Sequence, residues 1–326
     1  MSIVAGKSIL VTGGTGSFGQ NMVKYLLETS VSRVAIFSRD ELKQSDMRER
    51  IGADERLRFF LGDIRDESRL VTAFHGVDYV VHAAALKQVD SGEYNPIEFV
   101  QTNVIGSQNV ISAAIKTGVK KVVALSTDKA SSPINLYGAT KLTADKLFIA
   151  ANNYSQAYGT KYSVVRYGNV LGSRGSVIPY FMKLKRERKN IPITDRRMTR
   201  FWISISDAVR FVVETLEQMS GGELYVPKIP SMKIIDLAKM FADELEIVEI
   251  GIRPGEKLHE EMISSDDSRR TRDLGVRYVV DPLFADWGYA TDKGEAVQDG
   301  FTYRSDLNSE WITPEQMKTI IEKMTL

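Results

Sequence analysis

Short apolar runs rich in β-branched residues alternate with longer amphipathic stretches through the first half of the chain. The runs have the length and composition of buried strands, and the stretches between them repeat apolar residues at helical spacing. Six runs are predicted to be strands: Ser8–Thr12, Arg33–Phe37, Leu57–Leu61, Tyr79–Ala83, Lys121–Ser126 and Tyr162–Arg166. This alternation predicts an α/β fold with a Rossmann-type, doubly wound parallel sheet.

The strict alternation ends near residue 170 and divides the chain into two parts. Residues 1–170 are predicted to form the Rossmann domain, to which a helix–strand pair in residues 206–228 returns. Residues 171–205 and 229–326 are predicted to form mainly a smaller C-terminal lobe. In this architecture such a lobe covers the carboxyl ends of the strands, where substrates bind. Thr313-Pro-Glu-Gln316 has the form of a capping box and predicts a last helix.

Composition excludes several classes of protein. The chain has 326 residues, 43 basic and 42 acidic side chains, 43% hydrophobic residues and no cysteine. The lack of cysteine excludes a disulfide scaffold, a thiolate metal site and a cysteine nucleophile, and no metal site is predicted. The near-zero net charge argues against a nucleic-acid partner. No apolar run reaches the length of a membrane span and the N-terminus resembles a first strand more than a signal peptide, so we expect a cytoplasmic protein without a membrane partner.

The first predicted strand ends in a glycine-rich turn, Thr12-Gly-Gly-Thr-Gly-Ser-Phe-Gly19. Glycine is needed where a Cβ would block a tight turn or keep a pyrophosphate from the amide groups at a helix N-terminus. The position between a strand and a helix favours a dinucleotide site over an ordinary turn. The residues predicted to bind the cofactor in this turn are Gly13, Thr15, Gly16, Ser17, Phe18 and Gly19.

The end of the second predicted strand selects between two dinucleotides. An acidic side chain at this place binds the ribose 2′-hydroxyl of NAD, whereas an arginine can pair with the 2′-phosphate of NADP. Arg39 and Asp40 stand side by side here, and Ser38, Arg39 and Lys43 favour NADP, with plain surface charge as the alternative. Asp63, after the third strand, can receive the adenine amine or belong to an ordinary turn.

A tyrosine and a lysine are spaced for proton transfer. Tyr137 and Lys141 are four residues apart on a predicted helix, so their side chains share one face. A neighbouring cation lowers the pKa of a phenol and lets it act as a base near neutral pH. The pair follows a strand that ends in Ser126-Thr127. With the glycine turn, this arrangement resembles the extended short-chain dehydrogenase/reductase family, whose Ser/Thr, Tyr and Lys are matched by Thr127, Tyr137 and Lys141.

The residues after Thr127 narrow this resemblance. Asp128-Lys129 offers an acid and a base together, which water elimination requires and simple oxidation or C4 epimerisation does not. Over nearly its whole length the chain is similar to the inverting UDP-N-acetylglucosamine 4,6-dehydratases, which begin pseudaminic acid synthesis in bacteria. The similarity is weakest in residues 268–295, and Gln88–Gly92 departs from the family's usual sequence. A sister group of retaining dehydratases often has Met where this chain has Tyr137.

The resemblance implies a lyase that converts UDP-N-acetylglucosamine to UDP-2-acetamido-2,6-dideoxy-β-L-arabino-hexos-4-ulose. It implies C4 oxidation, water elimination across C5 and C6 and hydride return to C6, with NADP tightly bound and regenerated in each turnover. The catalytic residues would be Thr127, Asp128, Lys129, Tyr137 and Lys141. Lys129, with a pKa lowered by burial near other cations, would remove the C5 proton, and Asp128 would protonate the leaving C6 hydroxyl. A solvated salt bridge is the alternative for the Asp128-Lys129 pair.

The resemblance also implies binding residues and a homo-oligomeric assembly. Substrate contacts would come from Lys87, Asn169, Arg174, Gly175, Ser176, Val177, Ile178, Thr194, Arg253 and Glu256. Further cofactor contacts would come from Ser38, Arg39, Asp40, Lys43, Asp63, Ile64, Ala83, Lys87, Thr102, Tyr137, Lys141 and Val170. A guanidinium fork suits a diphosphate and a carboxylate suits ribose hydroxyls, although Arg253–Glu256 is also a turn sequence. The alternative functions are a retaining 4,6-dehydratase or C4 epimerase of a UDP-sugar, and a non-catalytic NADP-binding protein.

Overall fold

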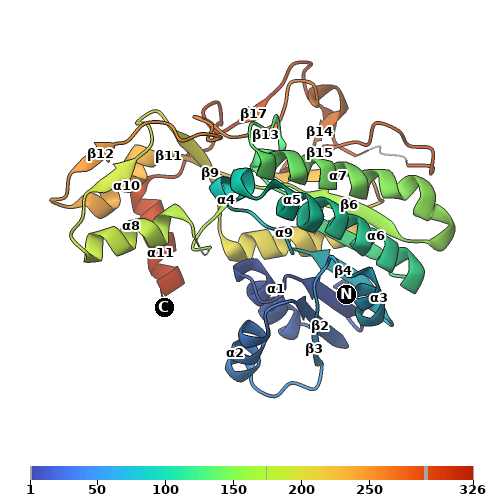
Figure 1. The fold of residues 1–326 in the computed structure, drawn as a ribbon. Coiled ribbons are helices and arrows are strands. Elements are labelled where there is room, and N and C mark those ends of the chain that lie inside the picture. Colours follow the sequence, from blue (N-terminus) through green and yellow to red (C-terminus); the bar gives the residue numbers. More distant parts are fainter. Residues whose placement is uncertain (1, 174, 290–292, 326) are drawn as a thin grey trace.

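The centre of the molecule is a ten-stranded sheet, seen in a computed structural model that describes residues 2–173, 175–289 and 293–325 (Figure 1). Seven of its strands run parallel in the spatial order β3-β2-β1-β4-β5-β6-β10. They are β3 (Leu57–Leu61), β2 (Arg33–Ser38), β1 (Ser8–Thr12), β4 (Tyr79–His82), β5 (Lys121–Leu125), β6 (Lys161–Val165) and β10 (Leu224–Pro227). The predicted doubly wound α/β fold is confirmed, and the six predicted strands lie within one residue of their expected bounds.

Three antiparallel strands extend the sheet beyond β10. They are β15 (Arg277–Val280), β14 (Thr271–Asp273) and β16 (Glu295–Ala296), and they pair in that order. These strands come from residues 229–326, which were expected mainly in the smaller lobe. Part of that segment therefore continues the large sheet, in the region where the sequence resembles the family least.

The order of the strands places a crevice at the end of β1. The chain moves outward from β1 to β3 and then returns to place β4 on the other side of β1. Thr12 pairs with Phe37 of β2 on one side and with His82 of β4 on the other. Ligands of open α/β sheets bind where the strand order reverses in this way. The glycine turn begins directly after Thr12, so it lies at this crevice.

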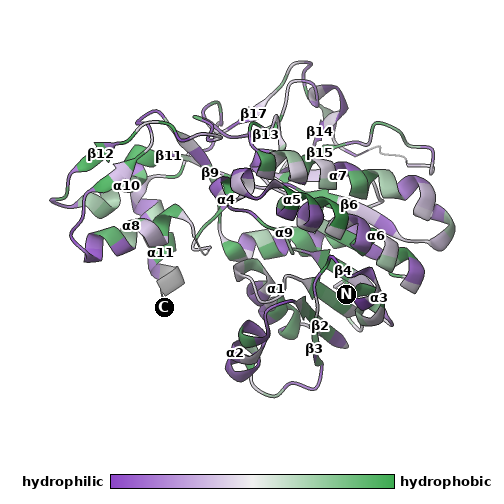
Figure 2. Cartoon of the chain, viewed as in Figure 1, coloured by the Kyte–Doolittle hydropathy of each residue, from purple (hydrophilic) through white to green (hydrophobic). Residues whose placement is uncertain are grey.

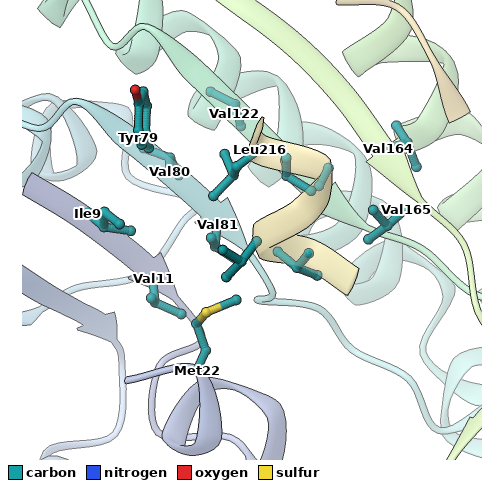
Figure 3. Packing of buried hydrophobic residues seen from close by; sticks show 14 of the residues in the cluster. Ile9, Val11, Met22, Tyr79, Val80, Val81, Val122, Val164, Val165 and Leu216 are labelled. Atoms are coloured by element: carbon teal, nitrogen blue, oxygen red, sulfur yellow. The ribbon is translucent and has the colours of Figure 1, made fainter. Parts of the chain in front are cut away.

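Two sets of helices cover the sheet. On one side α1 (Ser17–Leu27) packs against α9 (Ile205–Gln218), and on the other α3 (Glu67–Phe74), α6 (Gly106–Thr117) and α7 (Leu136–Ser155) pack in a row. Figure 3 shows Met22 of α1 and Leu216 of α9 over the buried residues Val11 and Val81. Each such side chain, fully removed from water, contributes about 1.5–3 kcal/mol to folding. The helix α2 (Glu41–Ile51) is largely hydrophilic, in contrast to its neighbour β3 (Figure 2).

One helical stretch changes its hydrogen-bonding pattern along its length. It is divided into α5 (Pro96–Phe99), the π-helical η1 (Val100–Ile105) and α6. In η1 the carbonyl of Asn103 accepts a hydrogen bond from the Ser107 hydroxyl at 2.6 Å, and local rearrangements of this kind accompany π-turns. The last helix, α11 (Pro314–Thr325), begins with the predicted capping box. Thr313 and Gln316 exchange hydrogen bonds of 2.9 and 3.2 Å.

The C-terminal half builds a second, smaller apolar cluster. It lies among α8 (Val177–Arg186), α10 (Ile234–Ala242), α11 and the two-stranded sheet of β8 (Ile191–Ile193) and β12 (Ile247–Glu249). Two more small sheets join this region to the large one: β7 (Asn169–Val170) with β9 (Thr199–Ile203) and β11 (Ser231–Lys233), and β13 (Glu261–Ile263) with β17 (Tyr303–Arg304). The short elements α4 (Val89–Tyr94), η2 (Asp128–Ala130), η3 (Gln156–Tyr158) and η4 (Ser268–Arg270) complete the chain. Within the described residues, no helix is both long and apolar enough to cross a bilayer.

We expect the stability of the protein to depend more on Gly19 than on the other glycines of the turn. A Cβ at Gly19 would lie 2.5 Å from the Gly13 carbonyl oxygen and 2.5 Å from the Gly14 Cα, so α1 would have to move away from β1. Gly19→Ala should therefore lower the free energy of unfolding by about 1–3 kcal/mol, the usual cost of overpacking. Urea denaturation followed by circular dichroism measures this change.

Gly16→Ala is the matched control for this substitution. Gly16 has a φ of −73°, which alanine adopts without strain, and a Cβ there would approach the Gly13 oxygen only to 3.2 Å. We expect a much smaller loss of stability from Gly16→Ala. Equal losses in the two variants would contradict the proposed role of close packing at Gly19.

Candidate active site

The glycine turn has the geometry of a cradle for a pyrophosphate. Gly13 has a φ of +67°, and a Cβ there would lie 2.8 Å from the backbone nitrogen of Ala84. Gly16 is the N-cap of α1 and supplies no side chain to cap the helix, so the positive end of the helix dipole faces the turn. The glycines of the turn therefore leave its backbone accessible from the crevice. The arrangement fits a dinucleotide cofactor, whose diphosphate would lie against these amide groups.

Charged groups after β2 are already engaged with one another. Asp40 caps α2 by accepting a hydrogen bond from the Lys43 amide at 3.0 Å, and its carboxylate pairs with the Lys43 ammonium at 2.5 Å. The Arg39 guanidinium lies 3.6 Å from a carboxylate oxygen of Asp63 and its side chain is 56% exposed. Ser38 is buried and accepts hydrogen bonds from Thr15 and Gln44, both at 3.2 Å. Asp40 therefore caps α2, and Arg39 remains exposed to solvent.

A cavity of about 710 Å³ runs from the glycine turn toward the C-terminal lobe. Of the predicted cofactor residues, its walls include Gly13, Thr15, Gly16, Ser17, Phe18, Gly19, Lys43, Ala83, Lys87, Tyr137, Lys141 and Val170. Of the predicted substrate residues, they include Lys87, Asn169, Gly175, Ser176, Val177, Thr194, Arg253 and Glu256. Two segments distant in the sequence, the Rossmann strands and the loop around residue 255, therefore face one space.

Other predicted residues lie outside the walls of this cavity. They are Ser38, Arg39, Asp40, Asp63, Ile64, Thr102 and Ile178. Thr102 accepts hydrogen bonds from the Arg65 guanidinium at 2.6 and 2.9 Å, and Ile64 and Ile178 are buried among apolar neighbours. Arg174 lies outside the residues that the structure describes.

The predicted catalytic residues meet because α7 begins directly against η2. Tyr137 lies in the first turn of α7, Lys141 lies one turn later, and Thr127-Asp128-Lys129 leads from β5 into η2. A Cβ at Gly138 would lie 2.1 Å from the Lys129 carbonyl oxygen, so glycine after Tyr137 permits this contact. All five side chains line the cavity. The structure therefore brings together the whole predicted catalytic set.

Asp128 is suited to donate a proton. Its side chain is 1% exposed, and one carboxylate oxygen accepts hydrogen bonds from the Thr127 hydroxyl at 2.8 Å and from the Lys129 ammonium at 3.1 Å. The other oxygen, Oδ2, is buried without a hydrogen-bond partner among the described residues. Burial raises the pKa of Asp128 above its ordinary value, and the nearby Glu260 adds to this effect against the opposing charge of Lys129. Asp128 therefore accepts and holds a proton more readily than an exposed aspartate does.

The expected low pKa of Lys129 is not found. Burial alone would lower it, but the Asp128 and Glu260 carboxylates raise the pKa of Lys129 above its ordinary value. The Lys129 ammonium lies 3.1 Å from Asp128 and 3.0 Å from Glu260. The sequence-based prediction assumed that cations surround Lys129, whereas its nearest partners are anions. With these partners Lys129 is charged. The pair is also not the solvated salt bridge considered as its alternative, because Asp128 is buried.

The pKa of the Tyr137 phenol also differs from the sequence-based prediction. Burial raises its pKa to about 12, while the charge of Lys129 and a hydrogen bond with Thr127 lower it. Lys129, rather than the expected Lys141, is the cation with the largest effect on Tyr137. Burial lowers the pKa of Lys141 itself, and Asp145 opposes this shift. Lys141 is 4% exposed and still faces the cavity, as a ribose-binding lysine would.

A buried histidine connects the glycine turn to the helices behind it. His82 is 1% exposed and forms hydrogen bonds with the Thr12 hydroxyl at 2.8 Å and with the Ser107 hydroxyl at 3.4 Å. Burial lowers its pKa to about 3, and Lys141 adds to the effect. His82 therefore stays neutral at physiological pH and fixes the ends of β1 and β4.

Four charged residues that line the cavity were not among the predicted site residues, Asp90, Arg200, Lys257 and Glu260, and two of them are buried. Glu260 is 2% exposed and pairs with Lys129, and Arg200 of β9 is 6% exposed and pairs with Glu260 and Glu256. No local pattern marks either residue, because both become part of the site only through pairing across distant segments. In the sequence, Glu260 and Arg200 can be recognised only as charged residues within or beside apolar strands.

Comparison with known proteins gives a consistent family. A model of polysaccharide biosynthesis proteins matches residues 9–282. The inverting UDP-N-acetylglucosamine 4,6-dehydratase of Campylobacter jejuni strain 81-176 is 52% identical over 326 residues, covering 97% of each chain. A UDP-glucose 4-epimerase of Rickettsia canadensis is 41% identical and covers 97% of this chain and 95% of the relative. The X-ray structure of Pen from Bacillus thuringiensis has 37% identity and a TM-score of 0.92, covering 99% of each chain.

These similarities extend through both the Rossmann strands and the C-terminal region. The epimerase and the dehydratase differ by about ten percentage points in identity, and the dehydratase matches more closely. The sequence, the fold and the geometry of the site therefore indicate the same family. The chain belongs to the polysaccharide biosynthesis protein family and, within the extended short-chain dehydrogenases/reductases, to the inverting UDP-N-acetylglucosamine 4,6-dehydratases.

Proposed function

We propose that the protein is an NADP-dependent lyase that dehydrates UDP-N-acetylglucosamine with inversion at C5. The product is UDP-2-acetamido-2,6-dideoxy-β-L-arabino-hexos-4-ulose. The observation that carries the proposal is the Asp128-Lys129 pair beside Tyr137 in one cavity, in a chain that is 52% identical to a relative with this activity. Elimination needs a second acid and base beyond Tyr137, and a C4 epimerase does not.

The choice of NADP over NAD is supported by the side chains after β2. Asp40 is held by α2 and Lys43, so its carboxylate is less available to a ribose hydroxyl. The exposed Arg39 can turn from Asp63 to a 2′-phosphate, and Lys43 lines the cavity nearby. Ser38, Arg39 and Lys43 would hold the phosphate, the glycine turn the diphosphate, and Lys141 the nicotinamide ribose. When bound, the dinucleotide would supply a hydride acceptor and donor for the sugar.

The first chemical step depends on Tyr137. As C4 loses hydride, Tyr137 accepts the proton of the C4 hydroxyl, and Thr127 orients that hydroxyl by hydrogen bonding. Burial raises the pKa of the phenol to about 12, and the hydrogen bond with Thr127 and the charge of Lys129 in the free enzyme oppose this rise. The C4 ketone formed in this step makes the proton on C5 acidic.

Elimination then depends on the buried pair. Lys129, in its neutral form, takes the C5 proton, and Asp128 gives its proton to the C6 hydroxyl, which leaves as water. The raised pKa of Asp128 lets it hold this proton at higher pH than an exposed aspartate would. After hydride returns to C6, a proton delivered to the opposite face of C5 inverts that centre. The hydride lost from C4 is recovered at C6, so no external reductant is consumed.

The substrate is held from both sides of the cavity. We propose that Arg253 and Glu256 bind the diphosphate and the uridine ribose, that Thr194 lies near the nucleoside, and that Lys87 and Asn169 contact the sugar. Gly175, Ser176 and Val177 precede or begin α8 and would close the sugar end. Glu256 Oε2 is buried without a hydrogen-bond partner among the described residues, which suits an acceptor for ribose hydroxyls.

We further propose that the enzyme acts in the cytoplasm as a homo-oligomer, with no nucleic-acid or membrane partner. The formal net charge of +1 supports a small-molecule substrate over nucleic acid. Large apolar side chains are exposed along α4, α5 and η1, where Tyr94 is 91% and Ile97 is 62% exposed. A second copy of the chain would remove such groups from water.

Proton NMR of the protein with UDP-N-acetylglucosamine in D₂O tests the function. We expect a new C6 methyl signal, deuterium at C5 and the coupling constants of the L-arabino configuration, because the C5 proton is replaced from solvent. A methyl signal with the D-xylo configuration would assign a retaining dehydratase. A change of configuration at C4 without a methyl signal would assign an epimerase.

Arg39→Ala is expected to separate the two cofactors. Loss of a guanidinium–phosphate contact at a solvent-exposed site should weaken NADP binding by about tenfold, and NAD binding should stay almost unchanged. Isothermal titration with each dinucleotide, after removal of copurified cofactor, measures both constants. Arg50→Ala is the matched control, because Arg50 is an exposed arginine at the far end of α2. Equal effects of Arg39→Ala on both dinucleotides would argue against the NADP assignment.

Asp128→Asn is expected to stop the reaction before water leaves. The amide cannot donate the acidic proton, so kcat for product formation should fall by about 10²- to 10⁴-fold. Reduced nicotinamide should then accumulate in a stopped-flow absorbance trace, since C4 oxidation does not need Asp128. Asp128→Glu keeps the acid and should recover part of the activity. Unchanged kcat in Asp128→Asn would remove Asp128 from the mechanism.

A further inference from the structure

A row of alternating charges connects the catalytic pair to the proposed nucleotide end of the cavity. Its first part is Asp128, Lys129 and Glu260, with the Lys129 ammonium 3.1 Å from Asp128 Oδ1 and 3.0 Å from Glu260 Oε1. Asp128 and Glu260 are 1% and 2% exposed. The two carboxylates are therefore shielded from solvent, whereas the Lys129 side chain is 25% exposed, and each group depends on its neighbours to balance its charge.

The second part of the row continues through Arg200. The guanidinium of Arg200 lies 3.6 Å from Glu260 Oε1 and 3.4 Å from Glu256 Oε1, and Glu256 Oε2 lies 3.8 Å from Arg253 Nε. Arg253 is exposed and Glu256 is half-buried, whereas Arg200 is buried. One continuous set of ion pairs therefore runs from the proton-transfer groups to the residues proposed to hold the substrate's diphosphate and ribose.

Arg200 is the fixed member of this row. Its guanidinium donates hydrogen bonds to the backbone carbonyls of Thr199 at 2.8 Å, Leu258 at 3.1 Å and Lys257 at 3.0 Å. Three carbonyl contacts restrain the position of the guanidinium, and its charge is always present. The carboxylates on either side of Arg200 are the groups that can change partners.

Glu260 is shared between two cations. Both Lys129 and Arg200 approach its Oε1 atom, whereas Oε2 is buried without a hydrogen-bond partner among the described residues. A carboxylate that pairs with arginine through two oxygens forms a stronger contact than one shared through a single oxygen. Glu260 therefore has an unused oxygen with which to strengthen one pair at the expense of the other.

The proposed reaction requires Lys129 to change its charge. Removal of the C5 proton needs a neutral amine, but the free enzyme holds Lys129 as an ammonium between two carboxylates. The groups that face it are the anions Asp128 and Glu260, the cations Arg200, Lys87 and Lys257, and the phenol of Tyr137. Among these, Glu260 is the anion whose pairing extends toward the substrate's nucleotide.

We propose that Glu260 is a positioning residue that holds Lys129 as an ammonium in the free enzyme and releases it when the nucleotide end of the cavity is filled. Substrate ribose hydroxyls donate hydrogen bonds to the Glu256 carboxylate, so Glu256 balances the charge of Arg200 less and Arg200 attracts Glu260 more strongly. Glu260 then balances the charge of Lys129 less, and Lys129 passes its proton to the adjacent Asp128 carboxylate and becomes the base at C5. The inference rests on the proposed function, in which Glu256 binds the ribose and Lys129 acts at C5.

Deuterium exchange at C5 of the 4-keto product isolates this effect. Exchange in D₂O requires removal of the proton beside the ketone and no hydride transfer, so it reports Lys129 without the C4 step. Proton NMR gives the exchange rate as a function of pD at saturating and at limiting product concentration. The saturating rate reports the pKa in the complex, and the rate at limiting concentration reports the pKa in the free enzyme. For the unmodified chain we expect the first pKa to lie below the second by about 1 or more, a typical effect of one nearby charge.

Glu260→Gln removes the shared carboxylate and should change the free enzyme most. The pKa at limiting product concentration should fall by about 1–3, and the difference between the two conditions should disappear. Glu261→Gln is the matched control. Glu261 carries the same charge one residue later, accepts hydrogen bonds from Ser131 and Ser132 and does not line the cavity. This variant should keep both pKa values of the unmodified chain.

Glu256→Gln provides a second test that leaves Glu260 in place. It breaks the Arg200–Glu256 pair permanently, so the free-enzyme pKa should move toward that of the complex even if Glu260→Gln fails to fold. The inference is overturned if the unmodified chain shows one pKa under both conditions, or if Glu260→Gln keeps the difference. Failure to form the methyl product from UDP-N-acetylglucosamine would instead overturn the proposed function itself.

Discussion

The pairing of buried charges at the carboxyl edge of the sheet is the interaction on which the site depends. Asp128 and Glu260 are almost fully removed from water, and an isolated carboxylate in such a place would be strongly unfavourable. Lys129 and Arg200 make their burial possible, and the backbone carbonyls that hold Arg200 fix the geometry. The site is therefore held by groups whose charge also decides the chemistry, so position and protonation state are coupled.

The parts of the structure that follow from local pattern were predictable from the sequence. The apolar runs predicted β1 to β6, and Gly13 and Gly19 predicted the turn. Each of these predictions depends on a repeat of apolar residues or on a steric requirement within a few residues. The spacing of Tyr137 and Lys141 predicted that they share a face of α7. The antiparallel strands β14 to β16 were not predicted, since their place on the sheet depends on pairing with β10 across the C-terminal half.

The electrostatics of the site could not be predicted from the same patterns. The sequence places Lys129 beside Asp128 but gives no sign that Glu260, more than a hundred residues later, completes its environment. The sign of the pKa shift of Lys129 depends on that distant anion, and the prediction from neighbouring cations was wrong for this reason. The phenol of Tyr137 shows the same limit, because burial in the folded chain is the largest cause of its raised pKa.

The Rossmann core is separate in the sequence from the residues that set the charges of Asp128 and Lys129. This separation explains how one fold can support different reactions on nucleotide sugars. In the proposed mechanism, the glycine turn, Tyr137 and Lys141, which lie on the Rossmann strands and helices, serve the transfer of a hydride and a proton at C4. Elimination would need an acid and a basic amine as well, and the charges of Asp128 and Lys129 depend on partners from residues 200–260. A change in those partners alone would leave the fold and the C4 chemistry intact but alter the charge of Asp128 and Lys129. In this mechanism, the choice between C4 chemistry alone and dehydration therefore depends on the place where the C-terminal segments meet the strand edge.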